Sequence, residues 1–69
     1  MMKYAIYIVA GNTKRLVSLH DIKAEALEAG KKIHEELSNK QGTVSCLEEE
    51  FDEFGQRIGT KSNICKVWM

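Results

Sequence analysis

The stretch KYAIYIVA (residues 3–10) is rich in β-branched and aromatic residues, as is typical of a β-strand. It is followed by GNTK (residues 11–14), in which Gly11 and Asn12 suit the positive-φ positions of a tight hairpin turn. RLVSLH (residues 15–20) then predicts the returning strand. The first twenty residues therefore predict a β-hairpin.

A helix is predicted from Ile22 to about Asn39. Asp21 is the expected N-cap, because its carboxylate suits a helix N-terminus. The alternative, in which Ser18 is the cap and Asp21 completes a capping box, is less favoured because Ser18 still alternates like a strand residue. Gly30 costs roughly 1 kcal/mol in a helix interior, so we expect close packing against a sheet at that position. The apolar stripe that defines the helix consists of Ile22, Ala26, Ala29, Ile33 and Leu37.

TVSCLEEEF (residues 43–51) predicts a third strand, and RIGTKSNICKVWM (residues 57–69) contains a fourth. The predicted fold is a two-layer α+β domain over residues 1–69, in the order β-β-α-β-β. One helix would pack on one face of a four-stranded, mainly antiparallel sheet. The strand order 2-1-3-4 is preferred, with 2-1-4-3 as the alternative.

The segment EEEFDEFGQRIG (residues 48–59), which runs from the third predicted strand into the fourth, carries five acidic side chains in its first six positions. An EF-hand loop with Gly55 as its sixth residue would place Phe54 and Lys61 at two ligand positions, which excludes that calcium site. DEFG (residues 52–55) instead suits a type I turn closed by a glycine bulge, with Arg57 returning close to Glu50. We expect a solvated hairpin end from Glu48 to Glu53, the alternative being a docking surface for a basic partner.

Composition excludes several classes of function. Ten basic and ten acidic residues give no net charge, which argues against a general nucleic-acid binder. No apolar run reaches the ~20 residues that span a bilayer, so we expect no membrane association. The N-terminus MMKYAIYIVAG alternates like a strand and ends in a turn, so we interpret it as mature structure and expect a cytoplasmic protein with reduced thiols.

Few residues in the sequence suggest a catalytic or metal-binding site. Cys46 and Cys65 lie in the two strands of the second hairpin and are interpreted as core thiols, although a bridge between them is geometrically conceivable. His20 and His34 lack a metal-ligand spacing and have no neighbouring nucleophile. The glycines are scattered singly, without a phosphate-binding loop. We therefore expect a non-catalytic protein with no cofactor and no metal.

The first strand is apolar on both faces, and one helix can cover only one of them. Strong sheet curvature or another molecule must cover the second face. We expect a homodimer that buries Tyr7 or Trp68 through this open face, with an unidentified protein partner as an alternative. In the last strand Ile64 and Trp68 are expected to point the same way. The two sides of the first strand are Tyr4, Ile6 and Ile8 against Ala5, Tyr7 and Val9.

The alternative function is a module that binds single-stranded nucleic acid. Aromatic residues on a sheet face can stack on bases, and nearby basic residues can contact phosphates. The neutral charge makes nucleic acid the less favoured partner. The candidate residues are Tyr4, Tyr7 and Trp68, with Lys3, Arg15 and Lys66.

EALEAGKKI (residues 25–33), FDEFGQRIG (residues 51–59) and CKVW (residues 65–68) carry a resemblance to short bacterial proteins. Those proteins combine an EAL..G helix, an FDE-x-G turn and a K-x-W end. Phe54 departs from the asparagine of that turn. The resemblance implies a fold and no activity.

Overall fold

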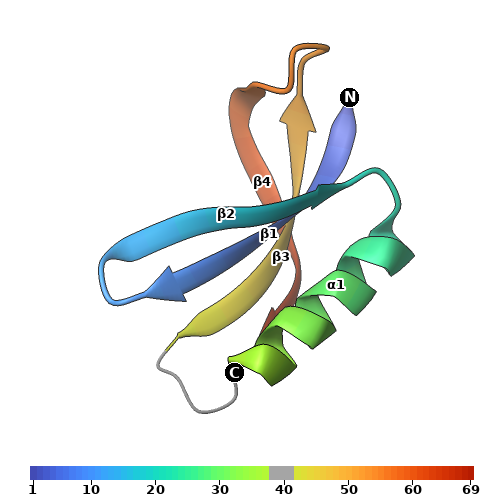
Figure 1. The fold of residues 1–69 in the computed structure, drawn as a ribbon. Helices are drawn as coiled ribbons and strands as arrows, with labels where there is room; N and C mark the ends of the chain where they lie inside the picture. The colour runs from blue at the N-terminus through green and yellow to red at the C-terminus, as the bar shows by residue number, and fades with distance from the viewer. Residues whose placement is uncertain (38–41) are drawn as a thin grey trace.

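The computed structural model describes residues 1–37 and 42–69, with the backbone alone at residues 60 and 61. It confirms the order β-β-α-β-β (Figure 1). The helix prediction was too long: α1 ends at Glu36, and the predicted positions 38 and 39 lie outside the described residues. The elements are β1 (Met2–Ala10), β2 (Thr13–His20), α1 (Lys23–Glu36), β3 (Thr43–Phe51) and β4 (Arg57–Trp68).

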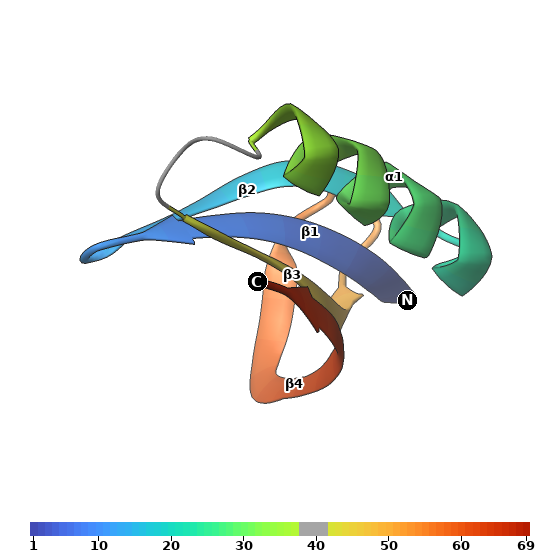
Figure 2. The same ribbon diagram turned by 90° about the horizontal axis from the view of Figure 1, so that it is seen from below.

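The four strands form one antiparallel sheet in the order β2-β1-β3-β4, as preferred from the sequence. The chain leaves β2, passes through α1 and returns as β3 on the other side of β1. Figure 2 shows α1 on one side of the sheet, while β4 curls away from it. This twist and curl are what an isolated small sheet needs in order to bury part of both faces.

The main core lies between the sheet and α1. Ile6, Val44 and Cys46 are fully buried there against Ala26 of the helix. Gly30 is also buried, and the indole ring of Trp68 lies directly over it. The close packing expected at Gly30 is thus confirmed, because the missing side chain leaves room for the ring.

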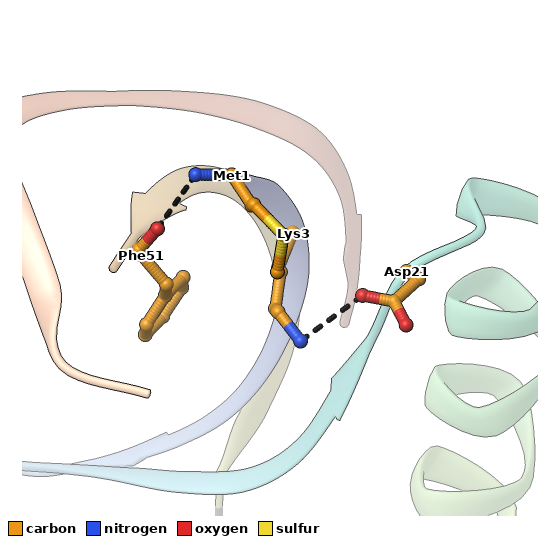
Figure 3. A network of polar contacts seen from close by, with 4 residues as sticks. All are labelled: Met1, Lys3, Asp21 and Phe51. Carbon is orange, nitrogen blue, oxygen red and sulfur yellow. Dashed lines mark hydrogen bonds and ion pairs between the residues drawn. The ribbon is translucent and has the colours of Figure 1, made fainter. Parts of the chain in front are cut away.

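The predicted N-cap is wrong. The residue that precedes α1 is Ile22, in an extended conformation and without a side-chain capping bond. The Asp21 carboxylate instead lies 3.0 Å from the Lys3 ammonium group (Figure 3). Ser18 does not cap the helix either, since it remains in β2 and bonds the ring of His20. Asp21 is thus paired with a residue of β1, and Ser18 with a residue of its own strand, so neither side chain caps the helix.

Both hairpin predictions are confirmed. Gly11 adopts a φ of 59° in the first turn, but the positive φ expected of Asn12 is wrong, because no residue other than glycine has a positive φ in the described part of the chain. In the second, the N–H of Gly55 donates to the carbonyl of Asp52 at 3.1 Å, and the φ of Gly55 is 82°. The Asp52 carboxylate also accepts bonds from the backbone N–H groups of Phe54 and Gln56. This is the type I turn with a glycine bulge expected from DEFG.

Pairing between β1 and β3 extends to the first residue. The Met1 ammonium group donates to the carbonyl of Phe51 at 2.6 Å (Figure 3). The N–H of Phe51 in turn donates to the carbonyl of Met1 at 2.7 Å. The start of β1 and the end of β3 are thereby fixed beside the second hairpin turn.

A β-bulge at Cys65 changes the faces of β4. Ile64 pairs with Leu47, whereas Lys66 pairs with Cys46, so Cys65 is one extra residue. Residues paired across antiparallel strands share a face, and Leu47 and Cys46 lie on opposite faces. The expectation that Ile64 and Trp68 point the same way is therefore wrong, since the bulge reverses the alternation between them.

Candidate interaction surface

We call the sheet surface opposite α1 the helix-free face. The strand register defines it as three central cross-sheet rows. Their members are Leu16, Tyr7, Ser45 and Val67 in one row, Leu19, Ala5, Leu47 and Ile64 in the next, and Lys3, Glu49 and Ser62 in the third.

The middle of the helix-free face is already covered. Ala5 is fully buried and Leu47 is 8% exposed, and Phe51, on the same side at the end of β3, is 3% exposed. None of these side chains contacts the helix core, so their cover comes from the other strands and from larger side chains on the same face. The sheet curvature considered from the sequence therefore accounts for the centre of this face.

Glu49 is the unexpected member of this centre, because its carboxylate is fully buried. The Tyr7 hydroxyl donates to Oε1 of Glu49 at 2.5 Å. Nε of Arg57 lies 3.0 Å from Oε2, but the N–H is not aligned with that oxygen, so the contact is an ion pair without a good hydrogen bond. A buried carboxylate requires such partners, since an unpaired one would be very costly.

The predicted pairing of Arg57 with Glu50 is wrong. Arg57 faces Phe51 across the strands, and Glu49 is the acidic residue that shares its face. Glu50 points to the other side of β3 and is exposed. The period-two alternation of β3 decides which of the two carboxylates Arg57 can reach.

The remaining strand, β2, also contacts this group of residues, through Lys14. The Lys14 ammonium group lies 4.4 Å from the centre of the Tyr7 ring, in a cation–π contact. Lys14, Tyr7, Glu49 and Arg57 come from β2, β1, β3 and β4, respectively. We call these four residues the cross-sheet network, because it connects every strand on the helix-free face.

The electrostatics of the network favour a structural role. Burial, together with the hydrogen bond to Glu49, raises the pKa of Tyr7 to about 12. The hydroxyl therefore keeps its proton at neutral pH and remains a donor to the carboxylate. Oε1 of Glu49 accepts this hydrogen bond, and Oε2 lies beside Arg57 without a hydrogen bond. The arrangement ties residues of three strands together on the helix-free face.

The two candidate interface residues lie on opposite faces. Tyr7 belongs to the helix-free face, whereas Trp68 is half-buried against Gly30 on the helix side. Tyr4 also packs on the helix side. The aromatic residues suggested for base stacking therefore do not form one continuous surface.

The acidic segment contains residues in four different environments. Glu50 and Glu53 are exposed, as expected of a solvated hairpin end, and Asp52 closes the turn. Glu48 is half-buried on the helix side, and Glu49 is buried on the other side. One signal in the sequence marks Glu49: it stands at period-two spacing between Leu47 and Phe51, on the apolar side of the strand.

The described residues offer little else for chemistry. Within residues 1–37 and 42–69, no three His, Cys, Asp or Glu side chains are grouped so that they could hold a metal ion. The helix in this part of the chain is neither long nor apolar enough to cross a membrane.

No known protein family, curated protein or solved structure matches this chain at a significant level. The resemblance to short bacterial proteins therefore stays a prediction.

Proposed function

We propose that this protein is a small non-catalytic assembly module that pairs with a second copy of itself through the helix-free face. The observation that carries the proposal is the amount of exposed surface. The chain exposes 5011 Å². A folded monomer of 7.8 kDa typically exposes ~4,400 Å². The excess of roughly 600 Å² belongs to the chain as a whole, and a standard interface buries ~800 Å² on each partner.

Apolar side chains on the helix-free face supply a surface for this contact. Leu16 on β2 is 47% exposed, and Ile64 and Val67 on β4 are 71% and 40% exposed. They flank the buried centre on both sides and share its two apolar rows. A two-fold dimer uses one self-complementary patch twice, so a single surface of this kind suffices.

The charges on the outer strands favour contact through the face over pairing of strand edges. The charged side chains of β2 and β4 are all basic: Lys14 and Arg15 on β2, and Arg57, Lys61 and Lys66 on β4. Each of these strands also carries a bulge, at Val17 and Cys65. Lysines and bulges on edge strands are recognised barriers to edge-to-edge pairing.

A binding role is favoured over catalysis, because the buried carboxylate of Glu49 is paired with Tyr7 and Arg57 of its own sheet. Nucleic-acid binding has less support, since Tyr7 and Trp68 lie on opposite faces. We also propose a cytoplasmic location, and an unidentified protein partner is the alternative to a second copy.

Light scattering behind size exclusion, over a concentration series up to high micromolar, tests the self-association. We expect the apparent mass to rise from monomer to dimer. Ile64→Lys should raise the dimer dissociation constant at least ~10-fold, because a buried interfacial contact of ~1.4 kcal/mol would be lost. A wild-type protein that stays monomeric throughout would contradict the proposal.

Phe54→Ser provides the matched control. Phe54 is 82% exposed but lies in the β3–β4 turn, away from the helix-free face. It should leave the dissociation constant unchanged. If both variants weaken association equally, the contact is a general hydrophobic one and the assignment to the helix-free face is wrong.

A further inference from the structure

The bulge in β4 brings the two cysteines of the chain together. Cys65 and Lys66 together oppose Cys46, which is the geometry of a β-bulge. Opposed residues of antiparallel strands have Cα atoms roughly 4.5–5.5 Å apart, within the roughly 4.4–6.8 Å that a disulfide spans. Both side chains pack in the core on the helix side, and both thiols are free. The two sulfur atoms therefore lie on the same side of neighbouring strands.

We propose that Cys46 and Cys65 are a redox-active pair that a peroxide converts into an intramolecular disulfide, which fastens β4 to β3. Cys65 reacts first: its thiolate attacks one oxygen of hydrogen peroxide, the O–O bond breaks, and sulfenic acid and water form. The Cys46 sulfur then attacks the Cys65 sulfur, and the Cys46 proton passes to the departing sulfenic oxygen. The second step releases the sulfenic oxygen as water and leaves one S–S bond, so two thiols and one peroxide yield a disulfide and two waters.

The different burial of the two thiols sets this order. Cys65 is half-buried and can meet a small oxidant, whereas Cys46 is fully buried. Burial, and next the nearby charge of Cys65, raise the pKa of Cys46 to about 11. Cys46 is therefore shielded from direct oxidation, and it is placed to resolve the sulfenic acid that forms beside it.

The bond would act on an edge strand of the sheet. β4 is an edge strand with β3 as its one neighbour in the sheet, and its register with β3 is broken twice. A cross-link between Cys46 and Cys65 closes a loop that contains the second hairpin turn. Strand β4 would then no longer separate from β3 without opening of the disulfide.

The experiment treats the full-length protein with hydrogen peroxide and digests it with trypsin without reduction. Cleavage after Lys40, Arg57, Lys61 and Lys66 separates Cys46, in peptide 41–57, from Cys65, in peptide 62–66. We expect these two peptides to be linked, with the loss of two hydrogens. The linkage should slow amide exchange of β4 by on the order of 100-fold, because loop closure destabilises the open state.

Two variants keep the result interpretable. Cys46→Ala should accumulate sulfenic acid on Cys65, detected by dimedone, and Cys65→Ser should leave Cys46 unmodified. Disulfides between two chains through Cys65, or sulfinic acid on Cys65 of the wild-type protein without linkage, would overturn the proposal. The peptides are taken from the band of monomer mass on a non-reducing gel, so the linkage is intramolecular and the result is independent of self-association.

Discussion

Gly30 of α1 and Trp68 of β4 are in such close contact that a hydrogen atom is the largest side chain residue 30 can carry. A Cβ atom there would overlap the indole ring, with Cζ3 of Trp68 at 2.5 Å. The indole ring of the last strand can pack against the middle of the helix only because residue 30 has no methyl group. This contact anchors the C-terminal end of the edge strand to the core.

Gly30→Ala should lower the free energy of unfolding by about 1–3 kcal/mol, the usual cost of overpacking. The clash must outweigh the roughly 1 kcal/mol that alanine gains over glycine in a helix. Urea denaturation measures the difference. In a Trp68→Leu background the same change should instead stabilise the protein, because the ring is gone. A Gly30→Ala protein as stable as the wild type would show that Trp68 moves aside at no cost.

Glu49→Gln should lower the free energy of unfolding by about 1–3 kcal/mol, the range for hydrogen bonds and contacts that involve a buried charge. Glutamine retains the volume and can still accept from Tyr7, so the loss reports the ion pair with Arg57. Glu50→Gln, on the exposed side of the same strand, should stay within about 0.5 kcal/mol of the wild type. Equal effects of the two substitutions would contradict the buried pairing.

The free energy of unfolding should fall at alkaline pH, because two buried groups lose their protons there. Burial raises the pKa of Cys46 from 9.0 to about 11, and burial with the Glu49 bond raises that of Tyr7 from 10.0 to about 12. A raised pKa means that the folded state holds the proton more tightly than the unfolded chain. Each contribution is therefore complete below the ordinary value and is lost as the pH rises through the folded value.

Thermal unfolding, measured from neutral pH to about pH 12, reports this loss of stability. Tyr7→Phe should flatten the decline in the upper window, between about pH 10 and 12, and Cys46→Ala in the lower window, between about pH 9 and 11. An unchanged profile in both variants would show that other groups control the alkaline transition.

Asp52→Ala should destabilise the protein by about 0.5–2 kcal/mol, the range for loss of a capping side chain. The Asp52 carboxylate accepts from Phe54 at 2.9 Å and from Gln56 at 2.8 Å. Glu53→Ala, next to it and exposed, is the matched control and should have little effect. If the two changes cost the same, the loss reflects charge in the acidic segment and not turn geometry.

The sequence by itself determined the elements, their order and both turns. Alternation of apolar residues specified the strands, helical spacing specified α1, and the glycines of the turns marked where positive φ was needed. These are local properties, because backbone conformation and turn chemistry depend on residues a few positions apart. The contact at Gly30 was foreseen for the same reason: a mid-helix glycine has a local cost that close packing must offset.

Only the tertiary structure decided which side chains meet. Tyr7 and Glu49 are 42 residues apart in the chain, and their bond depends on the curl of the sheet. Asp21 paired with Lys3 instead of capping the helix, and a bulge at Cys65 placed Trp68 under α1 and Ile64 on the helix-free face. A period-two pattern assigns faces within a regular strand, but one extra residue reverses them. Whether that residue is accommodated depends on the packing of all four strands.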